Sequence, residues 1–133
     1  MPILDGVYSS FTDIQASRFG LRYIDQVLLD PKPREEWEGI IKKDLLTIFD
    51  IVRSEMGNVS RGFSILELNY GDSILRFQFG IPNADFPAPI KKNLFILDYD
   101  AYYQGLIEKD EILPKLETFH DRIKKMYKDS IIY

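Results

Sequence analysis

The chain has 133 residues, which predicts one domain with one hydrophobic core. Hydrophobic residues make up 45% and aromatic residues 14%, which is typical of a globular protein and excludes a disordered or fibrous chain. With 17 Lys and Arg against 21 Asp and Glu, the net charge is −4, so no basic field favours nucleic acid as a ligand. The sequence has no cysteine and one histidine, which excludes disulfides, thiolate chemistry and multi-histidine metal sites.

The first ten residues, MPILDGVYSS, contain no basic stretch and no long apolar run. The apolar runs elsewhere in the chain are shorter than the roughly 18 residues that a membrane span needs. We therefore expect a cytoplasmic protein that does not involve a membrane.

Residues 17–29 are predicted to form a strand, because apolar and polar side chains alternate with the period of a half-buried strand. One parity is apolar and the other mostly polar, with Phe19, Leu21, Tyr23, Val27 and Leu29 against Arg18, Arg22 and Gln26. The strand should end at the run Asp30-Pro31-Lys32-Pro33, since proline cannot donate to a β-ladder.

A long helix is predicted from Arg34 to Met56. Its apolar residues recur at spacings of four, four, three and four, which places them on one helical face: Trp37, Ile41, Leu45, Ile48 and Val52. Acidic residues in the first turns suit the helix dipole, and Gly57-Asn58 offers a left-handed stop. Gly39 inside this span costs about 1 kcal/mol relative to alanine and marks either close packing or a later start.

Gly62–Tyr70 and Ser73–Ile81 are predicted to form a β-hairpin. Its central turn residues are either Tyr70-Gly71 or Gly71-Asp72, since a two-residue turn with glycine joins antiparallel strands tightly. One parity of each strand is apolar and the other parity is mixed.

The segment Pro82–Lys92 holds three prolines and is typical of a loop that crosses an edge or an end of a sheet. A strand is predicted at Asn93–Tyr102 and a helix at Asp110–Tyr127, with Asp110 as its N-cap and Pro114 within its first turn. The order strand, helix, three strands, helix predicts the α+β class: a four-stranded, mostly antiparallel sheet with two helices on one face.

Three short motifs occur in order along the chain: SRFGLRYIDQVLL at residues 17–29, NLFILDYDAYY at 93–103 and LETFHDRIKKMYKDSI at 116–131. Together they resemble the C-terminal half of a sporadically distributed family of uncharacterised prokaryotic proteins with a GLRYIN-type strand signature. Asp25 stands where that family usually has Asn. The resemblance implies that the chain is a fragment of a longer two-part protein, and it implies an architecture rather than an activity.

The second face of the predicted sheet mixes charged and large apolar side chains. A face open to water seldom carries many large apolar residues, and a core seldom carries many charges. An interface with a partner fits both facts, and the alternative is an antiparallel sheet with an apolar outer face. The candidate interaction face consists of Arg18, Arg22, Ile24, Gln26, Phe63, Ile65, Glu67, Ile74, Arg76, Gln78, Ile96, Asp98 and Asp100.

Asp98 and Asp100 are two residues apart on one predicted strand, so their side chains emerge on the same face about 7 Å apart. With Glu67 they offer oxygen ligands for a divalent cation, or a carboxylate pair for acid–base chemistry. Arg22 and Arg76 on neighbouring strands offer another interpretation, neutralisation by cross-strand ion pairs. We expect no metal at these residues, because nearby arginines oppose a cation.

The remaining candidates favour structural roles. His120 lies near the apolar stripe of the last helix without an orienting carboxylate, and Tyr99, Tyr102 and Tyr103 are expected in the core. The basic cluster Lys124–Lys128 suits a helix C-terminus. The sequence contains no GxGxxG, P-loop, GxSxG or HExxH motif.

We therefore expect no catalytic residue and no cofactor, and a non-enzymatic protein-binding or assembly module that uses the mixed face. The expected partner is a second copy in a homo-oligomer, the N-terminal half of the same protein, or another protein, without nucleic acid. The alternative is an enzymatic or small-ligand-binding domain with a polar site on the same face, formed by Arg22, Glu67, Arg76, Asp98 and Asp100.

Overall fold

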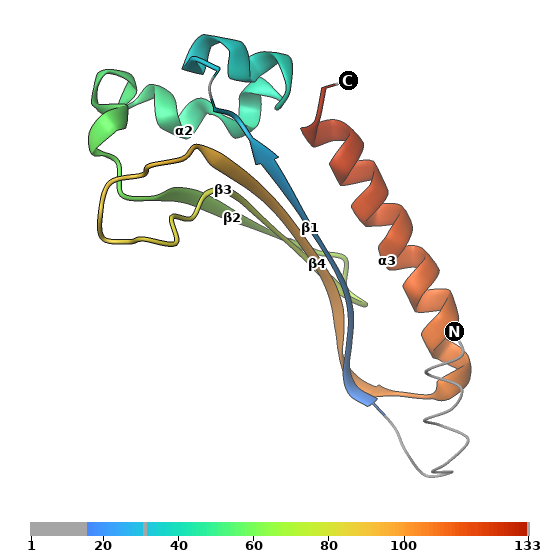
Figure 1. Cartoon of the computed structure of the whole chain (residues 1–133). Coiled ribbons are helices and arrows are strands. Elements are labelled where there is room, and N and C mark those ends of the chain that lie inside the picture. The colour runs from blue at the N-terminus through green and yellow to red at the C-terminus, as the bar shows by residue number, and fades with distance from the viewer. Residues whose placement is uncertain (1–15, 31, 133) are drawn as a thin grey trace.

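The computed structural model describes residues 16–30 and 32–132 (Figure 1). Its sheet consists of β1 (Ala16–Leu28), β2 (Gly62–Asn69), β3 (Ile74–Ile81) and β4 (Leu94–Ile107). The strands are antiparallel in the spatial order β1-β4-β3-β2, so β1 and β2 are the edges. One helix of 22 residues, α3 (Lys109–Ser130), follows β4. This architecture confirms the predicted α+β class with an antiparallel sheet.

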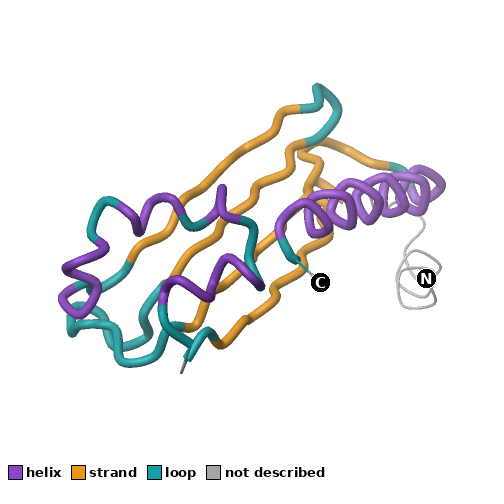
Figure 2. The backbone as a smooth tube through the Cα atoms, turned by 90° about the horizontal axis from the view of Figure 1, so that it is seen from above, coloured by secondary structure: helices purple, strands orange, loops and turns teal. Residues whose placement is uncertain are grey.

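The helical segments of the described residues lie on one side of the sheet (Figures 1 and 2). Helix α3 packs on β1, β4 and β3. Shorter helical pieces between β1 and β2 cover the other end of the same face (Figure 2). Within residues 16–30 and 32–132, no helix lies over the opposite face of the sheet (Figure 1).

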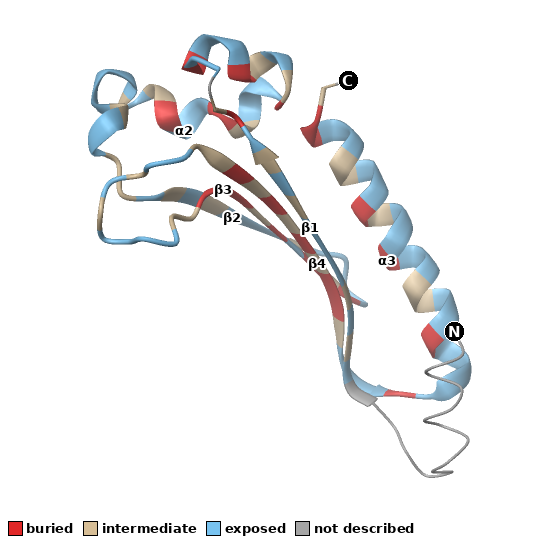
Figure 3. Cartoon of the chain, viewed as in Figure 1, coloured by how far each residue is buried: buried red, intermediate tan, exposed pale blue. Residues whose placement is uncertain are grey.

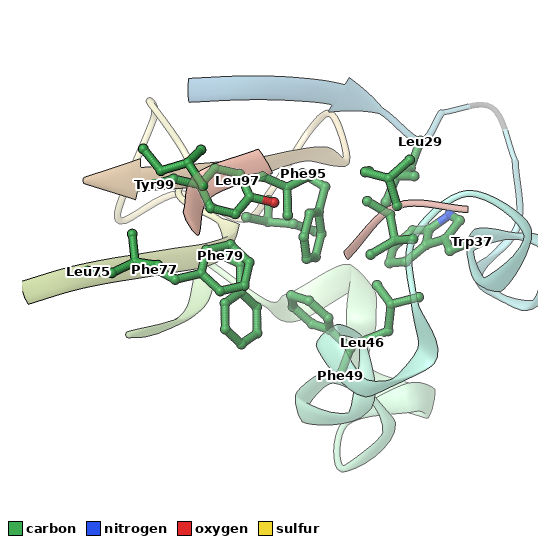
Figure 4. Packing of buried hydrophobic residues seen from close by; sticks show 14 of the residues in the cluster. Leu29, Trp37, Leu46, Phe49, Leu75, Phe77, Phe79, Phe95, Leu97 and Tyr99 are labelled. Carbon is green, nitrogen blue, oxygen red and sulfur yellow. The ribbon is translucent and has the colours of Figure 1, made fainter. Parts of the chain in front are cut away.

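The core lies between the sheet and these helical segments, and its residues alternate along the central strands. Figure 3 shows buried positions along β3 and β4, whereas the edge strands are more exposed. Phe77 stacks on Tyr99 of the neighbouring strand, with ring centroids 4.6 Å apart. Figure 4 shows the same cluster continuing to the helical pieces through Leu46 and Phe49.

The single long helix predicted over Arg34–Met56 is wrong. The structure has four short pieces there: η1 (Arg34–Gly39), η2 (Lys43–Leu45), α2 (Thr47–Asp50) and η3 (Arg53–Asn58), of which only α2 is α-helical. The break after Gly39 has a tertiary cause. Ile41 forms a β-bridge with Ile131 near the end of the chain, and the Ile132 amide donates to the Ile40 carbonyl at 2.8 Å. Lys42, the residue after Ile41, has a ψ of 135°, and its amide donates to the Ser130 carbonyl at 2.9 Å, so the chain cannot continue an i to i+4 ladder there.

This break also changes which side chains are buried. Leu46 and Phe49 are buried, although neither belongs to the predicted apolar face. Ile48, which does belong to that face, is 38% exposed. A helix interrupted by extended residues loses its phase, so periodicity read across the interruption selects the wrong residues.

Smaller differences concern the ends of elements. The Tyr70 amide donates to the Ser73 carbonyl, so Gly71 and Asp72 are the central turn residues, and Gly71 has a φ of 88°. Helix α3 begins one residue earlier than the predicted N-cap Asp110, which is therefore wrong. Pro114 lies inside α3 beyond the first turn, and the helix bond that it cannot donate falls near an exposed end, where water can reach the backbone.

Candidate functional site

The face of the sheet turned away from the helical segments is called the outer face below. Cross-strand register places on it the even-numbered residues of β1, β3 and β4 and the odd-numbered residues of β2. All residues of the predicted interaction face therefore share this face. The residues of the other parity face the core, as predicted: Leu75, Phe77, Leu97 and Tyr99 are buried there.

Four charged residues form one row across the outer face, called the charged row below. Arg22 of β1 lies opposite Asp100 of β4. Asp100 lies opposite Arg76 of β3, and Arg76 lies opposite Glu67 of β2. The formal charges thus alternate in sign from one edge of the sheet to the other.

Each of these arginines makes an ion pair on its own sheet. The Arg22 guanidinium donates from Nε and Nη2 to the two oxygens of Asp98, at 2.9 and 2.6 Å. Arg76 Nε donates to Glu67 Oε1 at 2.9 Å. These hydrogen bonds and the attraction of the carboxylates raise the pKa of Arg22 and of Arg76 above the usual arginine value.

Both aspartates of β4 are held by arginines. Asp98 binds Arg22, and Asp100 lies 3.6 Å from Arg18 Nη2. Within residues 16–30 and 32–132, no three or more Asp, Glu or His side chains are grouped so as to hold a metal ion. The ion pairs favour neutralisation of the carboxylates over the cation-binding interpretation, because a cation would have to compete with a guanidinium at each one.

Tyr102 belongs to the outer face, whereas the sequence analysis expected it in the core with Tyr99 and Tyr103. The predicted strand ended at Tyr102, but β4 continues to Ile107. Tyr102 is buried on the outer face, with the Arg18 guanidinium 4.5 Å and the Arg76 guanidinium 5.9 Å from its ring centroid. The sequence did contain a signal for this position, because Tyr102 has the same parity as Asp98 and Asp100 and therefore shares their face of the strand. Two guanidinium groups near one ring favour an ordered arrangement of the arginines.

Large apolar side chains lie on one side of the charged row. Ile24 of β1 is 52% exposed and Ile65 of β2 is 51% exposed, and Phe63 and Leu28 are exposed as well. A hollow of about 260 Å³ borders Ile24 and Phe63, and its lining also includes Arg22, Gln26, Gln78 and Asp98. The strands bend, and the outer face lies on the inside of the bend (Figure 1).

A second hollow, of about 370 Å³, lies between β1 and α3. His120 borders it and meets the ring of Tyr23 edge-on, with centroids 6.3 Å apart. The Tyr127 hydroxyl donates to Asp25 at 3.1 Å within the same hollow. Contrary to the expectation for His120, a carboxylate oxygen of Asp121 lies 3.7 Å from its Nδ1, although both side chains are largely exposed.

Tyr99 is buried in the core, as expected, and Tyr103 is half-buried with Lys115 Nζ 4.4 Å from its ring centroid. The lysines of the cluster Lys124–Lys128 are exposed on α3.

Comparison of the chain with protein-family models, with curated proteins and with solved structures finds no match. In the part of the chain that the structure describes, no helix has the length and apolar character to cross a membrane.

Proposed function

We propose that this protein is a non-enzymatic assembly module that binds a second copy of itself through the outer face. One observation carries the proposal: exposed apolar residues and an ordered row of ion pairs share a sheet face that no helix of the described residues covers. A partner surface would remove the apolar residues from water and give the charges further opposite charges.

The charge pattern favours a second copy as the partner. A face that carries positive and negative residues in alternation can be complementary to itself, because a rotated copy presents the opposite sign at each position. Ile24 and Ile65 are exposed isoleucines of the outer face on the two edge strands, and they provide apolar contact at both ends of the row next to the charged row.

Light scattering on the full chain at increasing protein concentration tests this proposal. We expect a dimer at high micromolar concentration, and we expect Ile24→Glu to reduce the dimer fraction by placing a charge on the apolar part of the outer face. The matched control is Ile51→Glu, since Ile51 is 84% exposed and lies in the helical region between β1 and β2. A strict monomer, or an equal effect of both variants, would overturn the proposal.

Binding of a small ligand on the same face is the second candidate function. It is favoured by the hollow of about 260 Å³ on the inside of the bend, since ligand sites are concave and combine apolar walls with a few polar groups. In that case the chain stays monomeric, and Gln78→Ala alters the binding of a ligand without altering the mass in solution. Protein-observed NMR with a fragment library, on the original chain and on Gln78→Ala, distinguishes this candidate from the dimer.

A further inference from the structure

Resting on the proposed function, we infer that two copies pack outer face to outer face about a two-fold axis that runs parallel to the strands. This axis passes above the boundary between β3 and β4, the middle of the sheet. It places β1 over the β2 strand of the partner and β4 over the β3 strand of the partner. The inference therefore names the partner and also the residues that meet.

The charged row determines this choice of axis. With the axis parallel to the strands, Arg22 meets Glu67 of the partner subunit, and Asp100 meets Arg76 of the partner subunit, so every facing pair has opposite charge. With the axis along the row instead, Arg22 meets its own copy, and each facing pair has like charge. Like charges brought together at an interface oppose association, so the charged row favours the first of these two arrangements.

The next row away from the charged row supports the same axis. It runs Ile24, Asp98, Gln78, Ile65 from β1 to β2. The axis brings Ile24 onto Ile65 of the partner subunit, which pairs the two exposed apolar residues. It also brings Asp98 near Gln78 of the partner subunit, whose amide can donate to the carboxylate.

The following row shows complementarity of size. Ile96 of β4 lies opposite Gly80 of β3. The same axis puts Ile96 over Gly80 of the partner subunit, so a large side chain faces a position without one. At the edges of this row, Gln26 meets Phe63 of the partner subunit without such a match. The pairs near the axis in three successive rows, and the edge pairs of the first two, thus match by charge, apolar character or size under one symmetry operation.

The geometry of packed sheets allows these contacts. Aligned sheets cross at about 30° and lie roughly 10 Å apart, so residues near the axis stay in register while edge residues shift along the strands by about one position. The bend widens the gap where the charged row lies, halfway along β1 and β4, and its arginine and glutamate side chains are long enough to span it. The described face covers four strands of eight or more residues, roughly 500 Å² in plan, which suits a dimer of modest affinity.

Complementary charge reversals test the predicted pairs. Arg22→Glu alone and Glu67→Arg alone should each weaken the homodimer at least about tenfold, because each creates two facing pairs of like charge. A mixture of the two variants should recover the dimer, since both facing pairs then have opposite charge. Lys125→Glu is the control, because Lys125 is exposed on α3, on the other side of the sheet, and the same charge change there should leave the dimer unchanged.

Single cysteines provide a second readout, because the natural chain has none. Near the axis, Gln78→Cys should lie roughly 11 Å from its own copy, whereas Ile24→Cys near the edge should lie roughly 18 Å from its own copy. A short bis-maleimide should therefore join two Gln78→Cys chains and not two Ile24→Cys chains. It should also join Ile24→Cys to Ile65→Cys when the two variants are mixed.

The outcomes separate this inference from the proposed function. If the original chain is a monomer by light scattering, both fail. If it is a dimer but the charge-reversed variants do not complement each other, or Ile24→Cys joins its own copy, the outer face remains the interface and this axis is wrong. Recovery of the dimer in the mixture together with crosslinking of Gln78→Cys supports the axis.

Discussion

Arg22 binds Asp98 diagonally across the β1–β4 ladder and not Asp100, the residue directly opposite it. The two hydrogen bonds of this fork leave Asp100 beside Arg18, 3.6 Å from its Nη2. Each aspartate of β4 therefore has an arginine of β1 beside it. An isolated surface carboxylate pair would have repelled itself, and the diagonal arrangement prevents this by interleaving the charges.

Replacement of Arg22 by methionine distinguishes the contribution of its ion pair to folding from its contribution to association. Arg22 is 58% exposed in the single chain, so loss of its pair with Asp98 should reduce the free energy of unfolding by at most about 1 kcal/mol. Association should be reduced far more, because Asp98 would then be desolvated at the interface without its partner. Urea denaturation of dilute protein measures the first quantity, and light scattering measures the second. Equal dimer fractions in both proteins would contradict the role assigned to Arg22.

Divalent cations should have little effect on this protein. Asp98 and Asp100 are paired with arginines, so millimolar Mg²⁺, Mn²⁺ or Ca²⁺ should change the melting temperature by less than about 2 °C. A site filled at 100 times its dissociation constant would stabilise the fold by about 2.7 kcal/mol, which a thermal melt of a domain this size detects easily. A clear shift with one of the three cations, and none with added NaCl of matched ionic strength, would restore the cation-binding interpretation.

Phe49 should contribute far more to stability than its sequence neighbours. It is buried against Trp37, with ring centroids 6.4 Å apart and the planes nearly perpendicular, so Phe49→Ala should cost about 3–5 kcal/mol. Ile51→Ala, at a position that is 84% exposed, should change the free energy of unfolding by less than about 0.5 kcal/mol. Denaturant titration of both variants measures the difference. A larger loss for Ile51 than for Phe49 would mean that the interrupted helical segment packs in another phase.

Gly80 should not tolerate a side chain. Its φ is 140°, and a Cβ atom there would overlap the backbone of Gly62 and Phe63 on β2. Gly80→Ala should therefore destabilise the fold by at least about 2 kcal/mol, from backbone strain and from separation of the hairpin strands. The control is Gly39→Ala, because a Cβ atom at Gly39 meets open space and alanine restricts the unfolded chain. Thermal melts that show equal loss for both variants would contradict this account.

The sequence predicted the strands and the composition of the outer face well because strand side chains alternate with a period of two. Ile24, Arg76 and Asp98 could be assigned to one face from their parity alone, without knowledge of which strands are neighbours. Strand order could not be predicted in this way. The pairing of β1 with β4 brings Arg22 beside Asp98, residues separated by 76 positions, and local pattern contains no information about such a distance.

The helical region shows the opposite case. Its apolar spacing predicted one helix through Ile41, but Ile41 forms a β-bridge with Ile131, and Lys42 beside it has a ψ of 135°. Burial of Leu46 and Phe49 then depends on where the chain resumes its helical turns. A local period describes only neighbours within a few residues, and here a contact between distant parts of the chain overrides it.

Local alternation and turn chemistry in the sequence alone thus determined the class of fold, the hairpin at Gly71 and the set of residues that share the outer face. Only the tertiary structure decided their order across the sheet, and with it the alternating charges from Arg22 to Glu67. The physical reason is that parity is a property of one strand, whereas a row of charges is a property of four strands held in register by hydrogen bonds between segments far apart in the chain.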